Sequence, residues 1–383
     1  MSFTPACDND LPPGAPVSSP TTRIPCIDIA KGLGMVLVVW VHTWCPFWLT
    51  HLYVNSFFFL LSGLFFRPRP WKQFAATQWH RLLRPFLIYY IIAIPFQILY
   101  WYIDHRTLAD FDWSKLLSLF TYASGTGYLF NIPLWFLLAL TWVRFAYRAV
   151  WRLPRRILFA VALACITAAP WIAYNVKSYL MLNQSVGPFG YYTLGVLGGP
   201  WLLGMMRDTR KTRRTAIISG ALLLALWVTE TTVTSRLAHY PLQALQTLTA
   251  ILFTLSLCAL FCAWTQRISR TAASASGHPR PGTQRKTGTW GKLQQKLSVV
   301  VKRQQKIGVW VERQLLWIGT NTVPILGLHL LILRPLNNII GHIPQLSHWY
   351  IGALLTLLTL TLLRCLLSLR HRLLSYRLMP SRP

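Results

Sequence analysis

The chain has 383 residues, of which 54% are hydrophobic and 12% are charged, and its formal net charge is +29. A soluble domain normally carries about a quarter charged residues, so the composition excludes an ordinary soluble protein. Several apolar runs approach the ~20 residues that cross a bilayer, and because they are continuous they do not fit a membrane β-barrel. The sequence therefore predicts an all-α, polytopic integral membrane protein.

The apolar runs predict about ten transmembrane helices in one bundle. In chain order these spans cover residues 29–49, 51–66, 86–103, 128–147, 156–174, 187–206, 215–233, 241–264, 315–333 and 347–369. The spans divide the chain into a disordered N-terminal tail (1–22), a bundle of spans 1–8 (23–264), a cytoplasmic insertion (265–311), spans 9–10 of the same bundle (312–370) and a basic C-terminal tail (371–383).

The distribution of basic residues predicts the orientation of the chain. If the N-terminus is cytoplasmic, only five of the 38 Lys and Arg residues fall on the outer side: Arg106, Lys115, Lys177, Arg236 and Arg334. This asymmetry is a strong positive-inside signal, and it places both termini in the cytoplasm. The basic excess then reports topology and attraction to anionic lipids, so we do not expect a nucleic-acid partner.

The insertion is the one long cytoplasmic segment. Its first half, residues 271–289, is rich in Ser, Gly, Pro and basic residues and is typical of a disordered segment. Its second half places apolar side chains at helical spacing among lysines, from Trp290 to Val311. This pattern predicts a basic amphipathic helix on the cytoplasmic leaflet.

Three ionisable residues of the first span share one helix face. Lys31 precedes His42 by eleven residues and Asp28 precedes it by fourteen, and at 100° per residue both return close to the direction of His42. His42 then lies roughly 16 Å above Lys31. An ionisable group at membrane depth usually faces a cavity, a partner or a reaction. A histidine satisfied by a neighbouring hydroxyl is the structural alternative.

Several stretches in the right order resemble the membrane acyltransferase-3 family. The first has an Asp, a basic residue and a His eleven residues later, as in Asp28, Lys31 and His42. The other similar stretches are residues 57–64, 81–86, 133–137 and 319–329. The chain departs from the family pattern at Lys31, where many members have Arg, and at Thr322 and Leu326, where Ser and Tyr are usual.

The resemblance implies acyl transfer, usually of acetyl, from cytoplasmic acyl-coenzyme A to a hydroxyl of a glycan. It implies an O-acetyltransferase of the bacterial inner (cytoplasmic) membrane that modifies an exopolysaccharide, a surface glycan or a lipid-linked oligosaccharide. The residues support this chemistry, because a neutral imidazole is the usual base for a hydroxyl proton. Burial disfavours the charged imidazolium. We therefore predict His42 as the general base, with Asp28 and Lys31 organising the cytoplasmic mouth. An acyl-imidazole intermediate on His42 is a less favoured variant.

The resemblance also suggests residues that bind the donor, acyl-CoA. Arg81 and Arg84 are candidates for the phosphates of the coenzyme, because Arg binds phosphate in a bidentate manner. Ordinary positive-inside anchoring explains the same two residues. The end of the second span adds Ser62 and Gly63, whose small side chains permit a close approach of backbones.

Four further residues are predicted to face the acceptor cavity. Trp135 and Phe136 belong to the fourth span, although aromatic residues in a bundle are commonly packing. Asn321 and His329 lie eight residues apart, within about 80° on their helix, and could face the same cavity as His42. This placement allows a contact between His42 and His329, but hydrogen bonding between helices explains Asn321 and His329 almost as well.

Other functions compete with this interpretation. A proton-coupled transporter or a flippase for a glycan precursor or small solute would suit many spans with internal His, Lys and Asp. Acidic residues are nearly absent from the predicted spans, however, and a carrier of this kind needs a titrating group near the midplane. An assembly subunit of a polysaccharide machine is a third class and leaves His42 unexplained. No cluster has metal-ligand spacing, and the seven scattered cysteines predict neither a zinc site nor a disulfide framework.

Overall fold

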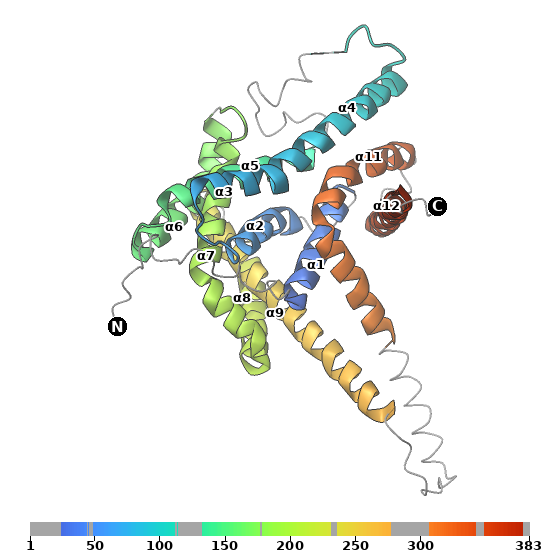
Figure 1. Ribbon diagram of the computed structural model, residues 1–383. Coiled ribbons are helices and arrows are strands. Elements are labelled where there is room, and N and C mark those ends of the chain that lie inside the picture. Colours follow the sequence, from blue (N-terminus) through green and yellow to red (C-terminus); the bar gives the residue numbers. More distant parts are fainter. Residues whose placement is uncertain are drawn as a thin grey trace, which may run out of the picture.

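The computed structural model describes residues 24–43, 45, 49–111, 113, 132–176, 178–230, 236–276, 306–341 and 348–377. These residues form a bundle of helices (Figure 1), so the predicted all-α class is confirmed. The predicted N-terminal tail and most of the predicted amphipathic helix lie outside them. In chain order the elements are α1 (Pro25–Val41), α2 (Leu49–Gly63), α3 (Trp71–Gln78), η1 (Trp79–Leu83), α4 (Arg84–His105), η3 (Ile132–Leu134), α5 (Trp135–Val150), α6 (Arg155–Asn175), η4 (Asn183–Ser185), α7 (Val186–Arg207), α8 (Thr209–Glu230), α9 (Arg236–Ser276), a helix over residues 306–320, α11 (Thr322–Gly341) and α12 (Trp349–Arg377).

Five helical segments of the described chain are long and apolar enough to cross a membrane. They are Trp71–Ile103, Arg155–Ala173, Pro241–Ser269, Thr322–Ile340 and Trp349–Arg370. Helices α1 and α2 are also apolar but have 17 and 15 residues, fewer than the ~20 of a straight span. The chain is therefore a multi-pass membrane protein. The count of ten spans and the cytoplasmic position of both termini stay predictions.

The first helix ends earlier than predicted. Helix α1 stops at Val41, and His42 takes a turn conformation with φ −83° and ψ 7°. Thr43 closes this turn, because its hydroxyl and its backbone N–H both donate to the carbonyl of Trp40, at 2.7 and 2.9 Å. Pro46 then follows in the sequence, and helical conformation is disfavoured just before a proline. His42 therefore stands at the end of a helix rather than inside one.

Residues 71–83 fall between the predicted second and third spans, but they are helical. Helices α3 and α4 join through η1 into one long rod (Figure 1), and the connection from α2 is reduced to residues 64–70. Pro85 explains the π-turn at η1, since proline lacks an N–H and crowds the preceding turn. The N–H of Arg84 instead reaches back five residues to the carbonyl of Trp79. A π-turn absorbs the missing bond without ending the helix.

The predicted insertion is also shorter than expected, because it is helical at both ends. Helix α9 continues past residue 264 to Ser276, and the next described helix already begins at residue 306. The two helices lie side by side where they leave the bundle (Figure 1), with Gly308 against the ring of Trp264. Helix α12 likewise extends to Arg377, into the predicted C-terminal tail.

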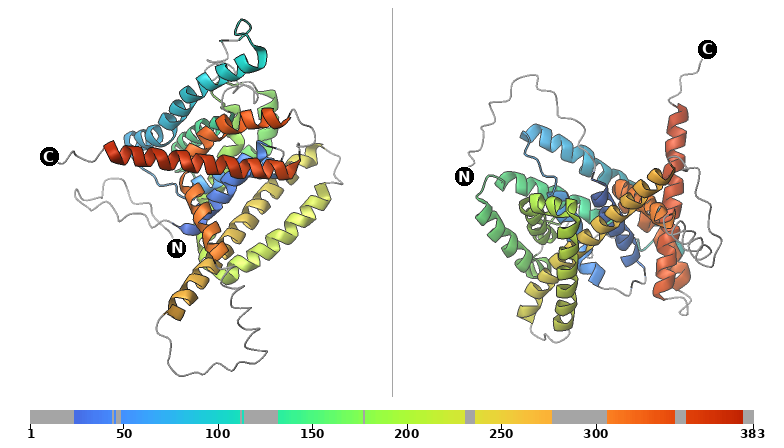
Figure 2. Two further views of the ribbon diagram at one scale, coloured as in Figure 1. Left: turned by 90° about the vertical axis from the view of Figure 1, so that its right-hand side faces the viewer. Right: turned by 90° about the horizontal axis from the view of Figure 1, so that it is seen from below.

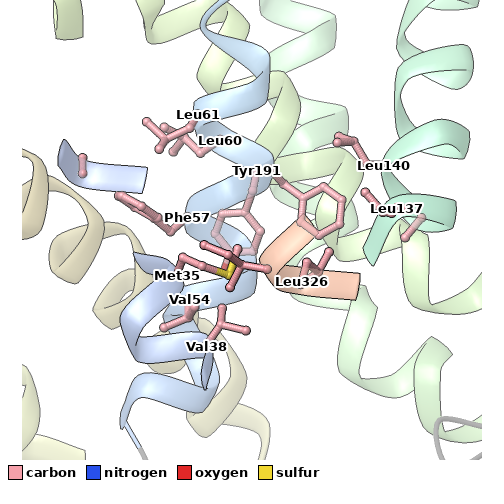
Figure 3. Close-up of a cluster of buried hydrophobic side chains, with 14 of the residues drawn as sticks. Met35, Val38, Val54, Phe57, Leu60, Leu61, Leu137, Leu140, Tyr191 and Leu326 are labelled. Atoms are coloured by element: carbon pink, nitrogen blue, oxygen red, sulfur yellow. The ribbon is translucent and has the colours of Figure 1, made fainter. Parts of the chain in front are cut away.

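Helix α1 lies inside the bundle, against α2, α9, α11 and α12 (Figure 2). Its buried residues include Met35 and Val38, which meet Val54 and Phe57 of α2 and Leu326 of α11 (Figure 3). In a membrane such packing stabilises helices through van der Waals contact rather than through the hydrophobic effect. The consequence is a central helix whose far end, at His42, is partly buried in the bundle.

Glycines allow α2 and α7 to touch at the backbone. A Cβ at Gly63 would overlap the carbonyl of Tyr192, and a Cβ at Gly195 would overlap the carbonyl of Leu60. Each helix thus presents a glycine to the main chain of the other, which is a close-packing arrangement typical of membrane helices. The contact fixes α2 and so the aromatic side chains that α2 carries beside α1.

Candidate active site

The two ionisable residues at the start of α1 form an ion pair. Lys31 Nζ lies 3.2 Å from Asp28 Oδ1, and both side chains are partly buried. The same ammonium group lies 5.6 Å from the centre of the Phe65 ring. Asp28 and Lys31, which were predicted to organise the same mouth, are therefore paired with each other. This pairing leaves this end of α1 nearly neutral while keeping the Lys31 ammonium accessible.

The backbone of α1 at this end touches the helix that leads into α11. A Cβ at Gly319 would overlap the carbonyl of Asp28, and a Cβ at Gly32 would overlap the carbonyl of Leu315. Such an approach is open only to glycine on both helices. It holds the start of α11 against α1, and it gives Gly319 a packing role within the stretch that resembles the family's late span.

His42 and His329 come together at the other end of α1. Their ring centres are 5.3 Å apart, and the ring planes are inclined by 41°. His329 lies on α11 and is 0% exposed. The contact between the two histidines, which helical spacing suggested, is thus a feature of the structure. It joins the first helix of the chain to the penultimate described one.

The hydrogen bonds of His329 fix its orientation. Its Nδ1 lies 2.9 Å from the carbonyl of Ile325 and 3.1 Å from that of Leu326, so Nδ1 carries the proton and donates to its own helix. Its Nε2 is buried and has no hydrogen-bond partner among the described residues. His329 therefore presents an acceptor nitrogen within a ring held beside His42.

Asn337 holds His42 from a second direction. The amide nitrogen Nδ2 of Asn337 donates to the backbone carbonyl of His42 at 2.8 Å. This bond satisfies a carbonyl at the end of α1 that has no partner within the helix. Asn337 was not among the predicted residues. It lies eight residues after His329 on the same helix, and the spacing argument that selected Asn321 would have selected it.

A cavity of about 230 Å³ lies against His42. Its wall is mostly apolar, and besides His42 it includes Met35, Phe58, Trp135, Phe136 and Thr322. Trp135 and Phe136 begin α5, where the short turn η3 directs the chain into the bundle. The ring of Phe136 also packs on Phe59, with 4.6 Å between ring centres. The structure thus places both predicted aromatic residues in one wall with His42.

The other predicted residues stand apart from this cavity. Arg81 and Arg84 are exposed on the rod formed by α3 and α4, Ser62 is half-buried near the end of α2, and Gly63 packs against α7. Asn321 lies at the break before α11, where its Nδ2 donates to the carbonyl of Trp317 at 2.8 Å. None of these residues lines the cavity. His329 is also absent from the wall, because it lies behind His42.

No group of three His, Cys, Asp or Glu residues that could hold a metal ion exists in the described part of the chain. The cavity instead offers one imidazole in an apolar wall, with a second imidazole behind it. A neutral imidazole in such surroundings can take a proton from a substrate hydroxyl. Together with a multi-pass helical bundle, this arrangement fits a membrane-embedded enzyme that transfers a group to an alcohol.

Comparison with family models identifies the class. Residues 24–367 match the family model described as an acyltransferase domain, and the chain belongs to this acyltransferase-3 family. The match begins just before α1 and ends within α12, so it includes all of the predicted site residues, from Asp28 to His329. The protein is therefore a membrane acyltransferase. No curated protein and no solved structure matches the chain.

Proposed function

We propose that this acyltransferase transfers an acetyl group, or another short acyl group, from acyl-CoA to a hydroxyl of an exopolysaccharide, a surface glycan or a lipid-linked sugar. We place it in the bacterial inner membrane, with the donor entering from the cytoplasm. The observation that carries the proposal is the position of His42, which lies in the cavity wall with His329 behind it. A base at this point meets an alcohol that enters the cavity.

In the proposed reaction, the acceptor oxygen attacks the thioester carbonyl while a ring nitrogen of His42 takes its proton. The C–S bond then breaks as the new C–O ester bond forms. The coenzyme leaves as a thiolate and takes the proton back from the His42 imidazolium, so the enzyme ends in its starting state. His329 acts as a positioning residue, because its acceptor nitrogen can bind an N–H of the charged His42 ring without itself carrying charge.

The donor would use the Lys31 end of α1. The Lys31 ammonium is partly exposed beside Asp28, and it can meet a phosphate or an amide of the pantetheine arm. Arg81 and Arg84 are exposed and so are accessible to the coenzyme's phosphates. Ser62 and Gly63, the last residues of α2, would flank the donor near Lys31. The long pantetheine arm of acyl-CoA can reach from the charged nucleotide outside the bundle to a thioester inside it.

The acceptor would occupy the cavity. Trp135 and Phe136 offer aromatic faces, on which the C–H face of a sugar ring can pack, and Thr322 adds a polar group to the wall. Asn321 does not share that wall. The proposal therefore keeps Trp135 and Phe136 as the acceptor contacts and moves His329 from acceptor contact to support of His42.

The test measures label transfer from radiolabelled acetyl-CoA to endogenous glycan in membranes that contain the protein. His42→Ala should lower transfer by at least a hundredfold, since a positioned base contributes about 10²–10⁴-fold. His105→Ala is the matched control, because this histidine is exposed at the end of α4 and stacks on Trp101. Retained transfer in His42→Ala would refute the assignment. Solute counterflow without label transfer would instead support the transporter or flippase.

A further inference from the structure

Helix α11 carries an unusual polar segment just after His329, which includes Arg334 and Asn337. Pro335 lies inside the helix and has no N–H, so the carbonyl of Leu331 loses its partner within the helix. The hydroxyl of Tyr100 on α4 donates to this carbonyl at 2.7 Å. A bare carbonyl is costly in a membrane, and this bond removes the cost. This hydrogen bond from Tyr100 holds α4 against α11, close to residue 334.

Arg334 is the charged residue at this junction. Its Nη1 donates to Oε1 of the buried Gln97 at 2.5 Å, and its guanidinium carbon lies 5.8 Å from the centre of the Tyr100 ring. Both neighbours are neutral. Arg334 forms no ion pair with any residue that the structure describes, although a guanidinium has five N–H donors. Its side chain is only half-buried, so the remaining donors are within reach of a ligand.

Asn337, one turn further along α11, adds an unsatisfied hydrogen-bond acceptor. Its Nδ2 is occupied by the carbonyl of His42, but its Oδ1 is buried and has no hydrogen-bond partner among the described residues. A buried acceptor without a donor is unfavourable, because it has lost its bonds to water and gained none in return. A hydroxyl group placed here would satisfy it. That hydroxyl would lie beside the residue that we propose as the base.

We propose that Arg334 and Asn337, which do not line the cavity but follow His329 on α11, bind the part of the acceptor that extends beyond the cavity past His42, and that the acceptor carries an oxyanion there, close to the hydroxyl that is acylated. Arg334 binds the oxyanion through its unused N–H donors, and Asn337 Oδ1 accepts a bond from a hydroxyl of the same sugar. The oxyanion is either the diphosphate of a lipid-linked sugar or the carboxylate of an acidic sugar, since Arg binds both in the same bidentate geometry.

This inference rests on the proposed function, because it names the substrate class of the same site. The placement along α11 supports it. His329, Arg334 and Asn337 follow one another within nine residues, and the first and third of them contact His42. With the predicted orientation, this segment lies on the outer side of His42, opposite to the Asp28–Lys31 pair. The site is therefore separate from the donor end.

The test measures binding without any acyl donor, so it does not depend on transfer. The full-length protein in phosphatidylcholine nanodiscs is titrated with two matched pairs of probes, and the thermal midpoint is followed. Farnesyl diphosphate is compared with farnesol, and octyl glucuronide is compared with octyl glucoside. We expect at least one charged probe to bind tenfold or more tightly than its neutral partner. The charged probe that shows this preference identifies the source of the oxyanion.

Three variants connect the preference to the site. Arg334→Gln should remove the preference for the charged probe, and Arg334→Lys should retain part of this preference. His42→Ala should keep the full preference, although acyl transfer is lost. Arg106→Gln is the matched control, since this basic residue is exposed on the same predicted side. Equal binding of charged and neutral probes, or an unchanged preference in Arg334→Gln, would overturn the proposal. Normal binding with no transfer in the native protein would instead count against the proposed function.

A last arm separates the acceptor from an ordinary membrane lipid. The titration is repeated in nanodiscs that contain phosphatidylglycerol, whose headgroup is also an oxyanion. We expect the preference for the charged probe to persist. If phosphatidylglycerol alone raises the thermal midpoint in an Arg334-dependent manner and abolishes the response to the probes, the segment is a headgroup site and the proposal fails.

Discussion

The side-chain amide of Asn337 donates to the backbone carbonyl of His42 at 2.8 Å, so one helix near the end of the chain fixes the end of the first. The same helix carries His329, whose ring lies 5.3 Å from that of His42. Two contacts from α11 thus hold both the backbone and the ring of His42. The position of the proposed base depends on α11 as much as on its own helix.

Asn337→Leu should weaken this hold. The variant loses the bond to the His42 carbonyl, which should lower the free energy of unfolding by about 1 kcal/mol. Misplacement of the base should lower kcat by about tenfold, since catalysis is sensitive to small displacements. Both are measured on the purified protein, by thermal unfolding and by acetyl transfer. Asn338→Leu is the control, because Asn338 is exposed and should tolerate the change. Equal effects in the two variants would contradict the assignment.

His329→Gln should separate positioning from packing. We expect kcat to fall by about tenfold to a hundredfold, less than in His42→Ala, with the KM for acetyl-CoA unchanged. Leu333→Ala provides the comparison, since this side chain is also 0% exposed and lies one turn further along α11. It should lower the thermal midpoint, because it leaves a cavity, and leave kcat nearly unchanged. A parallel loss of stability and kcat in both variants would show that His329 only packs.

Gly319→Ala should be strongly destabilising. The added methyl group meets the carbonyl of Asp28, and backbone cannot yield as a side chain can. We expect a loss of about 1–3 kcal/mol in the free energy of unfolding. Gly204→Ala is the matched control in α7, where a Cβ meets nothing within 4 Å. That substitution should stabilise its helix by about 0.5–1 kcal/mol. Thermal unfolding in detergent measures both, and similar midpoints would refute the contact.

Lys31→Met should act on the donor. The variant keeps the length of the side chain but loses the ammonium, and we expect the KM for acetyl-CoA to rise severalfold. Stability should change little, because an ion pair three residues apart on a helix contributes about 0.2–0.5 kcal/mol. Lys31→Arg retains the charge and should restore most of the affinity. A normal KM in Lys31→Met would leave Lys31 with no role beyond its pairing with Asp28.

The sequence was sufficient where helical periodicity alone decides the arrangement. The spacing of Asp28, Lys31 and His42 placed them along one helix. The spacing of Asn321 and His329 allowed both to face His42, and His329 does so. Periodicity could not show where α1 stops, because a tight turn closed by the Thr43 hydroxyl resembles a continuing helix in an apolar run. For the same reason the sequence did not predict the π-turn before Pro85, because a proline in this position is also typical of the start of a helix.

Tertiary contacts between distant segments were the part that no local pattern could supply. Asn321 and Asn337 both lie eight residues from His329, on opposite sides, and the sequence favoured Asn321 because it falls in a stretch similar to the family. At the break before α11, Asn321 bonds to the carbonyl of Trp317, whereas Asn337, two residues after Pro335, bonds to the carbonyl of His42 at the end of α1. The partners of Arg334 on α4 were equally invisible, since more than 200 residues separate them.

The complete burial of His329 has a consequence for the cell. Its ring gives its only N–H back to its own helix and has no surface in contact with solvent. A proton on His42 therefore cannot travel onward through His329 and must return along the path by which it came. If the donor and the acceptor enter from opposite faces, as we propose, the enzyme performs its acid–base chemistry without passing protons through His329 from one side of the membrane to the other.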